Sequence, residues 1–198
     1  MNTEADVIPR PTRPYGENFE AYVNSKALAY YATIDWIEEN KPAFDVINIQ
    51  PSYVIGANEL NTTVKEMQVG SNALALRPIL GGVVDQPVGF TTVHVDDVAF
   101  AHVKALDPSV KGGQSFVVSV PKQAGGWNDA IEIAKKLFPG AEEKLSLKGN
   151  QATKTNLLDT SKAERELGIK FKSFEEQIKS LVGHAIELKN AELSDGRL

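Results

Sequence analysis

The feature that most constrains the fold is the alternation of helical and strand-like patterns along the chain. From about Phe19 to Asn40, apolar residues recur at helical spacing, and Lys41-Pro42 ends the pattern because proline cannot continue a helix. The following run, Phe44–Gln50, is short and almost continuously apolar, which is typical of a strand buried in a parallel sheet. A long helix followed by such a strand predicts an α/β fold.

The rest of the chain repeats this alternation. We expect further strands at Phe90–Val95, Ser115–Val120 and Thr155–Leu158, and a connecting loop at 51–56. Helices are expected over 71–80, 98–106, 128–138 and 159–168, and from Ser173 onward, where Ser173 and Glu176 have the spacing of a capping box. Asp96 or Asp97 is expected to cap the helix over 98–106. We divide the chain into an extended lead-in at 1–20, one domain at 21–190 and a frayed tail at 191–198.

Composition restricts the function. The 198 residues, 42% of them hydrophobic, are enough for one globular domain with a core. A net charge of −5 with dispersed lysines argues against a nucleic-acid partner. The chain has no cysteine and its three histidines lack ligand spacing, so we expect no disulfide and no metal site. It has no apolar run of membrane-spanning length and its first residues are polar and acidic, so we expect a cytoplasmic protein that does not bind membranes.

Tyr22 and Lys26 are the candidate catalytic residues. Four residues apart on a helix, they lie on one face, close enough to act on one substrate atom. A neighbouring ammonium favours the ionised phenol, so the pair can exchange a proton with an oxygen on a carbonyl carbon. The same spacing also arises on ordinary amphipathic helices, where the tyrosine is half-buried and the lysine solvated. The segment alone leaves both interpretations open.

Several ordered blocks carry a family resemblance. The motifs Y-V-N-S-K, P-S-Y-V-I-G, T-V-H-V-D-D-V-A-F-A-H and D-T-S-K-A-E-R-E-L-G follow one another from about Ala21 to Leu188. In this order the sequence resembles the extended short-chain dehydrogenases/reductases (NAD-dependent epimerase/dehydratase-like). Within them it is similar to the fungal NADP-dependent aldehyde and ketone reductases and the dihydroflavonol reductases.

This resemblance implies a Rossmann-type doubly wound sheet with a small substrate-binding lobe, and NADP(H) as the cofactor. It implies that Tyr22 protonates the substrate oxygen and that Lys26 holds the nicotinamide ribose. It places Pro51, Ser52, Tyr53 and Val54 beside the nicotinamide, and it places the substrate, a small carbonyl compound, near Ile55, Leu60, Leu76 and Leu80.

The sequence departs from the family in its first part. A dinucleotide is held by a glycine-rich turn that opens a helix after a first strand, and no such motif occurs here. The family's catalytic serine precedes the tyrosine helix, but before Tyr22 the only side-chain hydroxyls belong to Thr3, Thr12 and Tyr15. We therefore expect the carboxyl-terminal part of such a domain, without its nucleotide-binding half and without hydride transfer of its own.

Three functions remain open at this stage. The chain can be the substrate and tyrosine part of a carbonyl reductase, in effect a truncated protein or pseudoenzyme. It can be a non-redox enzyme, such as an isomerase, dehydratase or cyclase, that uses Tyr22 and Lys26 without a nucleotide. It can also be a binding or regulatory protein. In each case an uncovered strand at 46–50 predicts a homo-oligomer or a partner-dependent protein.

Overall fold

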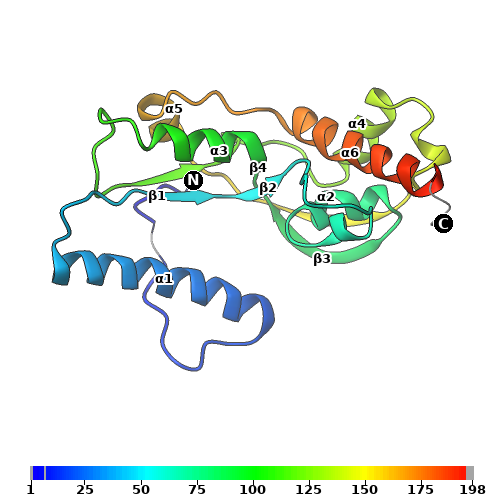
Figure 1. Cartoon of the computed structure of the whole chain (residues 1–198). Helices are drawn as coiled ribbons and strands as arrows, with labels where there is room; N and C mark the ends of the chain where they lie inside the picture. Colours follow the sequence, from blue (N-terminus) through cyan, green and yellow to red (C-terminus); the bar gives the residue numbers. More distant parts are fainter. Residues whose placement is uncertain (1, 7, 195–198) are drawn as a thin grey trace.

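The molecule is an α/β structure built on three pairs of parallel strands (Figure 1). This computed structural model describes residues 2–6 and 8–194. Within them, the strand pairs are β1 (Asn48–Pro51) with β5 (Ser115–Val118), β2 (Tyr53–Ile55) with β4 (Thr92–His94), and β3 (Val83–Phe90) with β6 (Asn150–Thr155). The α/β class and the parallel strands confirm the fold predicted from the sequence.

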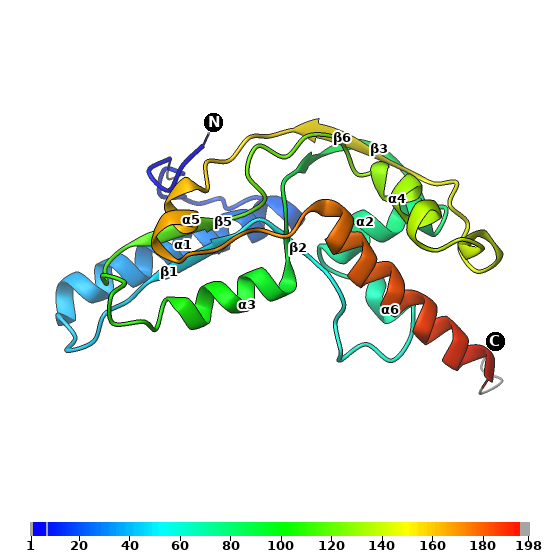
Figure 2. The ribbon, with the colours of Figure 1, turned by 90° about the horizontal axis from the view of Figure 1, so that it is seen from above.

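Six helices lie around these strands in the described part of the chain. They are α1 (Asn18–Asn40), α2 (Asn72–Ile79), α3 (Val95–Lys104), α4 (Asp129–Leu137), α5 (Ser161–Glu166) and α6 (Phe174–Ser194). Figure 1 shows α1 and α3 on opposite sides of β1, and Figure 2 shows α2, α4 and α6 gathered at the other end of the molecule. Single 3₁₀ turns occur at Glu66–Gln68 and Ala141–Glu143.

Two hydrophobic clusters hold these elements together. The larger cluster lies among α2, α4, α6 and β3 and is centred on Trp127 and Phe90. The smaller cluster packs α3 and α5 against β4 and β5, and its buried members are Val93, Ala101, Phe116, Val118, Ala163, Leu167 and Ile169. The β1–β5 sheet is therefore covered by a core on the side of α3, while the side of α1 contributes no buried residue.

The two edges of the β1–β5 sheet differ. The N–H of Asn48 donates to the C=O of Gln114 at 2.9 Å, and the N–H of Ser52 donates to Val118 at 3.1 Å. Both bonds leave β1 on the same side, so the peptide groups of Ile49 face an edge that no described strand occupies. On the far edge of β5, the N–H of Val117 donates to the carboxylate of Glu4 at 2.9 Å.

Helix α1 is attached mainly through the segment before it. None of its 23 residues is buried. Asp35 forms an ion pair with Arg10 at 2.7 Å, and the hydroxyl of Tyr31 donates to the C=O of Ile8 at 2.7 Å. These bonds are exposed, so each contributes little to stability on its own. The helix ends at Lys41, in the left-handed conformation, just before Pro42 as predicted.

Two strands predicted from the sequence were wrong in position, and two observed strands were not predicted. Residues 44–47 do not belong to the sheet: Phe44 is 61% exposed and stacks on Trp36, with ring centroids 6.2 Å apart. The predicted loop at 51–56 contains β2. The strand expected at 155–158 lies earlier, in β6, and its partner β3 was not predicted. One face of β3 and one face of β6 are exposed to solvent and carry polar residues. Their sequences therefore lack the continuous apolar run that indicates a buried strand.

The cap of α3 is a histidine and not an aspartate. His94 Nδ1 accepts the N–H of Asp96 at 3.1 Å, and burial lowers the pKa of His94, so the imidazole stays a neutral acceptor. Asp97 instead accepts the N–H of Lys172 at 2.8 Å and pairs with its ammonium at 3.2 Å. The motif T-V-H-V-D-D thus joins β4 and α3 to the segment before α6.

The capping box predicted for the last helix is confirmed. The N–H of Ser173 donates to the Glu176 carboxylate at 2.7 Å, and the N–H of Glu176 donates to Ser173 Oγ at 3.3 Å. Helix α6 continues to Ser194. Of the predicted tail, positions 195–198 lie outside the described residues.

Candidate active site

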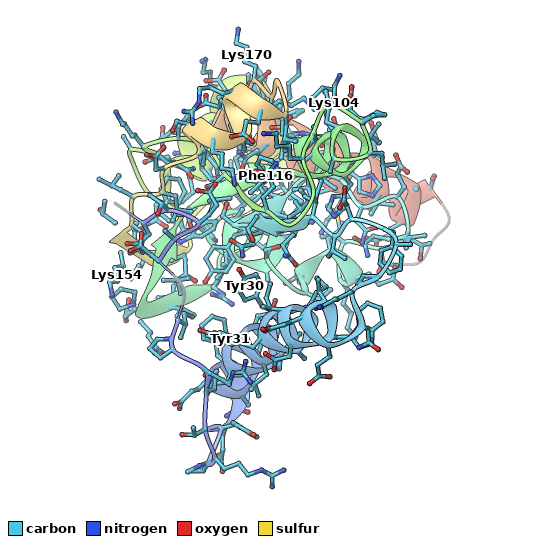
Figure 3. The ribbon with its side chains drawn as sticks, turned by 90° about the vertical axis from the view of Figure 1, so that its left-hand side faces the viewer. Tyr30, Tyr31, Lys104, Phe116, Lys154 and Lys170 are labelled. Atoms are coloured by element: carbon cyan, nitrogen blue, oxygen red, sulfur yellow. The ribbon has the colours of Figure 1, made fainter. Side chains whose placement is uncertain are left out.

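A cavity of about 720 Å³ separates α1 from β1 and contains the predicted catalytic pair. Tyr22 and Lys26 line it from one face of α1, and Pro51 lines it from the end of β1. Figure 3 shows Tyr30, on the same helix, lying on the side of α1 that faces the sheet. The predicted tyrosine, lysine and first residue of the nicotinamide loop are therefore brought to one cavity.

Within this cavity the tyrosine is accessible. Tyr22 is 56% exposed and stacks on Phe19, with ring centroids 6.0 Å apart. The Nζ atom of Lys26 lies over the Tyr22 ring, 5.7 Å from its centroid. Among the described residues no hydrogen bond joins the phenol to this ammonium, which instead lies over the face of the ring.

A second tyrosine, Tyr53, lies near enough to Tyr22 to be influenced by its charge. Tyr53, in β2, is half-buried and meets Trp127 edge to face, with ring centroids 5.8 Å apart. Burial raises the pKa of Tyr53, and the nearby Tyr22 phenol raises it further. Tyr53 therefore stays protonated at neutral pH and can donate a hydrogen bond. Of the other residues placed beside the nicotinamide, Val54 packs against the smaller hydrophobic cluster.

Ser52 belongs to a buried polar network that sequence reasoning missed. Its hydroxyl donates to Ser119 Oγ at 2.8 Å, and Ser119 Oγ donates to the C=O of Thr92 at 3.3 Å. The side chain of Gln123 accepts the N–H of Thr92 at 2.7 Å. This network ties the junction between β1 and β2 to the carboxyl end of β5. The available signal was the position of Ser119 at the end of the strand predicted over 115–120 and of Gln123 just beyond it.

The predicted substrate residues do not gather around this cavity. Ile55 and Leu76 are fully buried in the larger hydrophobic cluster, so a contact between either side chain and a substrate requires that core to open. Leu60 is 87% exposed. Leu80 lines a separate cavity of about 320 Å³ between α2 and β3. Their substrate roles remain predictions.

The two ends of a dinucleotide differ in how the described residues could hold them. Tyr22, Lys26 and Pro51, which were predicted to lie at the nicotinamide end, line one cavity. A pyrophosphate needs a helix N-terminus that follows a strand through a glycine-rich turn. Helix α3 does follow the parallel strand β4, but its first turn carries Asp96 and Asp97, which repel an anion. The described residues therefore do not fit the pyrophosphate.

The described residues form neither a metal site nor a membrane-spanning helix. The described residues contain no group of three or more His, Cys, Asp or Glu side chains placed to bind one metal ion. Among the helices of the described ranges, none combines the length and the apolar character needed to cross a bilayer.

Known proteins resemble this chain in sequence and in fold. No family model matches the chain. It is 35% identical over 196 residues to the ketoreductase CTB6 of Cercospora nicotianae, covering 95% of this chain and 54% of the relative. It is 33% identical over 177 residues to the NAD-dependent epimerase/dehydratase ALT6 of Alternaria alternata, covering 81% of this chain and 49% of the relative. The chain thus spans about half the length of the curated relatives it matches.

A solved structure shows the same fold. The yeast methylglyoxal/isovaleraldehyde reductase Gre2, solved with NADPH, superposes with a TM-score of 0.75 at 23% identity, over 95% of this chain and 57% of the reductase. The chain therefore has part of a Rossmann-type fold. More particularly, the chain resembles the carboxyl-terminal half of the extended short-chain dehydrogenases/reductases, next to fungal ketoreductases and epimerase/dehydratases.

Proposed function

We propose that this chain is the substrate-binding and catalytic-tyrosine part of an NADPH-dependent aldehyde or ketone reductase. The observation that carries the proposal is the single cavity that holds Tyr22, Lys26 and Pro51. It lies beside β1, and Pro51 ends that strand at its carboxyl end, the position where open α/β sheets bind ligands. The names of the relatives support the same chemistry.

The residues of this chain supply the proton that the carbonyl oxygen receives. A nicotinamide held beside Lys26 and Pro51 would supply the hydride that the carbonyl carbon receives. Tyr22 donates the phenolic proton to the carbonyl oxygen, and the charge of Lys26 stabilises the phenolate that remains. Tyr53, protonated and near Tyr22, can hold the same oxygen by a hydrogen bond.

The direct test joins this chain to a nucleotide-binding half. Residues 1–198 fused behind the amino-terminal half of the Cercospora ketoreductase CTB6 should oxidise NADPH when an aldehyde or ketone such as methylglyoxal is added. Absorbance at 340 nm measures the rate. A folded fusion that binds NADPH but reduces none of a broad panel of carbonyl compounds would contradict the proposal.

The unfused chain should bind NADPH only with millimolar affinity, because the described residues do not fit the pyrophosphate. Isothermal titration calorimetry measures the affinity. The CTB6 fusion is the matched control and should bind in the micromolar range. Micromolar binding by the unfused chain would show that it holds the pyrophosphate by another route.

A non-redox reaction is the second candidate. It is favoured by the open cavity around Tyr22 and Lys26, since proton transfer at a carbon next to a carbonyl needs no dinucleotide. The two candidate reactions can be distinguished by incubating the chain with a carbonyl substrate in deuterated water without nucleotide. Incorporation of deuterium next to a substrate carbonyl, lost in Tyr22→Phe, would support the non-redox reaction.

We also propose that a second copy of the chain covers the open side of the molecule. This side combines the free edge of β1 with exposed aromatic residues at both ends of α1, Phe19 at 62% and Phe44 at 61% exposure. Sedimentation at micromolar concentration should show a dimer. The double variant Phe19→Ser, Phe44→Ser should shift it towards monomer. Leu106→Ser, on the α3 side and 82% exposed in the parent, should not. A monomeric parent chain contradicts this proposal.

A further inference from the structure

The cavity between α2 and β3 contains a cation without an anionic partner. Arg77 lies in the last turn of α2 and is half-buried at the wall of this cavity of about 320 Å³. Within residues 2–6 and 8–194, no carboxylate approaches its guanidinium within 4.0 Å. Burying a charge even partly costs free energy unless the charge is paired. The unpaired Arg77 guanidinium is therefore a candidate binding group for an anionic ligand.

The guanidinium is held in place by a buried amide. Arg77 Nη1 donates to Oε1 of Gln151, which is fully buried. The Nε2 atom of Gln151 donates to the C=O groups of Ala152 at 3.1 Å and Gln86 at 3.3 Å, so the amide is fixed with its oxygen towards the arginine. A cation in the last turn of a helix also stabilises the helix end, but that role does not need a buried amide.

The neighbouring backbone leaves room for the arginine stem. The N–H of Gly82 donates to the C=O of Arg77 at 2.9 Å. A Cβ atom at Gly82 would lie 2.8 Å from Arg77 Cγ, so a side chain there would displace the arginine. The guanidinium has five N–H donors in a planar fork, and Gln151 occupies one. The remaining donors are available for a planar, two-oxygen acceptor.

Four of the other residues that line the cavity are apolar, and the remaining two are Gln68 and Gly82. Ala73 and Leu80 line it from α2, and Val83 and Val84 line it from β3. Val83 is 63% exposed, although an apolar ligand would cover it. Inorganic phosphate gains nothing from these side chains, whereas the hydrocarbon part of a carboxylic acid does. The volume is at the lower end of ligand pockets, which begin at roughly 300 Å³.

We propose that this cavity is a binding site for a small organic carboxylate with a short apolar chain. The carboxylate pairs with the fork of Arg77, and the apolar chain lies over Leu80, Val83 and Val84. The site lies outside the cavity of Tyr22 and Lys26, and it can be tested by binding alone, whether or not the chain is part of a reductase.

The experiment is a titration of the full chain with hexanoate, acetate and inorganic phosphate, followed by calorimetry and by amide NMR. We expect one saturable hexanoate site, with shifts centred on Arg77 and Val83. Arg77→Met should weaken hexanoate binding by about tenfold or more, because it removes a charge-assisted hydrogen bond pair. Arg77→Lys should also weaken it, since the lysine keeps the charge but lacks the fork. Arg165→Met, an exposed arginine on α5, should leave it unchanged.

A second variant keeps the proposal testable if Arg77→Met fails to fold. Val83→Asn alters only the exposed wall, so it should weaken hexanoate binding while acetate binding stays the same. If Arg77→Met loses its helical circular dichroism, Arg77→Lys and Val83→Asn decide the outcome. The proposal is overturned if the parent chain shows no saturable hexanoate site, if the folded Arg77 variants bind it equally well, or if phosphate binds as tightly as hexanoate.

Discussion

Replacing Tyr22 with phenylalanine in the CTB6 fusion should lower kcat for carbonyl reduction by at least about 100-fold, the usual contribution of a positioned proton donor. The substitution removes only the hydroxyl and keeps the ring that stacks on Phe19. Because Tyr22 is exposed and α1 has no buried residue, the fold should be unaffected. Steady-state NADPH oxidation and far-UV circular dichroism measure the two effects.

The same helix provides the control. Tyr30 also lines the cavity, but it lies about two helical turns beyond Tyr22 along α1, one turn past Lys26. Tyr30→Phe should therefore keep most of the activity. Lys26→Ala should act in the same direction as Tyr22→Phe, because it removes the charge that stabilises the phenolate. Full activity in folded Tyr22→Phe would exclude this tyrosine as the proton donor.

Replacing Trp127 with alanine should reduce the free energy of unfolding by about 3–5 kcal/mol, the range measured for large aromatic residues in cores. Trp127 is fully buried and meets Phe90 and Tyr53 edge to face, at centroid distances of 5.2 and 5.8 Å. Its Nε1 atom donates to the C=O of Val88 at 3.4 Å, so the substitution also leaves that oxygen unpaired. Urea unfolding followed by circular dichroism measures the change.

The other tryptophan is the matched control. Trp36 is 48% exposed on α1 and contacts Phe44 by stacking. Trp36→Ala should cost no more than about 1 kcal/mol at the same protein concentration, since little apolar area is lost and one stacked pair is broken. Equal losses in both variants would show that α1 is as much part of the cooperative unit as the core.

Local patterns predicted the helices better than the strands. The bounds of α1 and the capping box of α6 follow from side chains within a few residues of one another, and both are as predicted. The strands β3 and β6 come from distant parts of the chain and include charged or polar residues on their wet faces. Their pairing is specified by a partner that a local pattern does not contain.

The candidate site also contains some features that a local pattern predicts and others that only the fold creates. Tyr22 and Lys26 share a face because of their spacing on one helix, so their placement side by side could be predicted from the sequence, while their catalytic role stays a prediction. The bond between Ser52 and Ser119 joins residues that are far apart in the sequence, and only the folded sheet brings them together. The capping role of His94 was missed because histidine is not among the usual N-cap residues.

The carboxylate of Glu4 limits how copies of this chain can associate. It occupies the N–H of Val117 on the outer edge of β5, so the β1–β5 sheet can gain a strand only beside Ile49. A fibre grows when each molecule presents two complementary edges, one to receive and one to extend. With a single usable edge, strand pairing between copies ends in a closed two-fold dimer. An unlimited β-ribbon requires the loss of both the Glu4 carboxylate and the Lys162 ammonium, which donates to the C=O of Ser115 on the same outer edge at 2.8 Å.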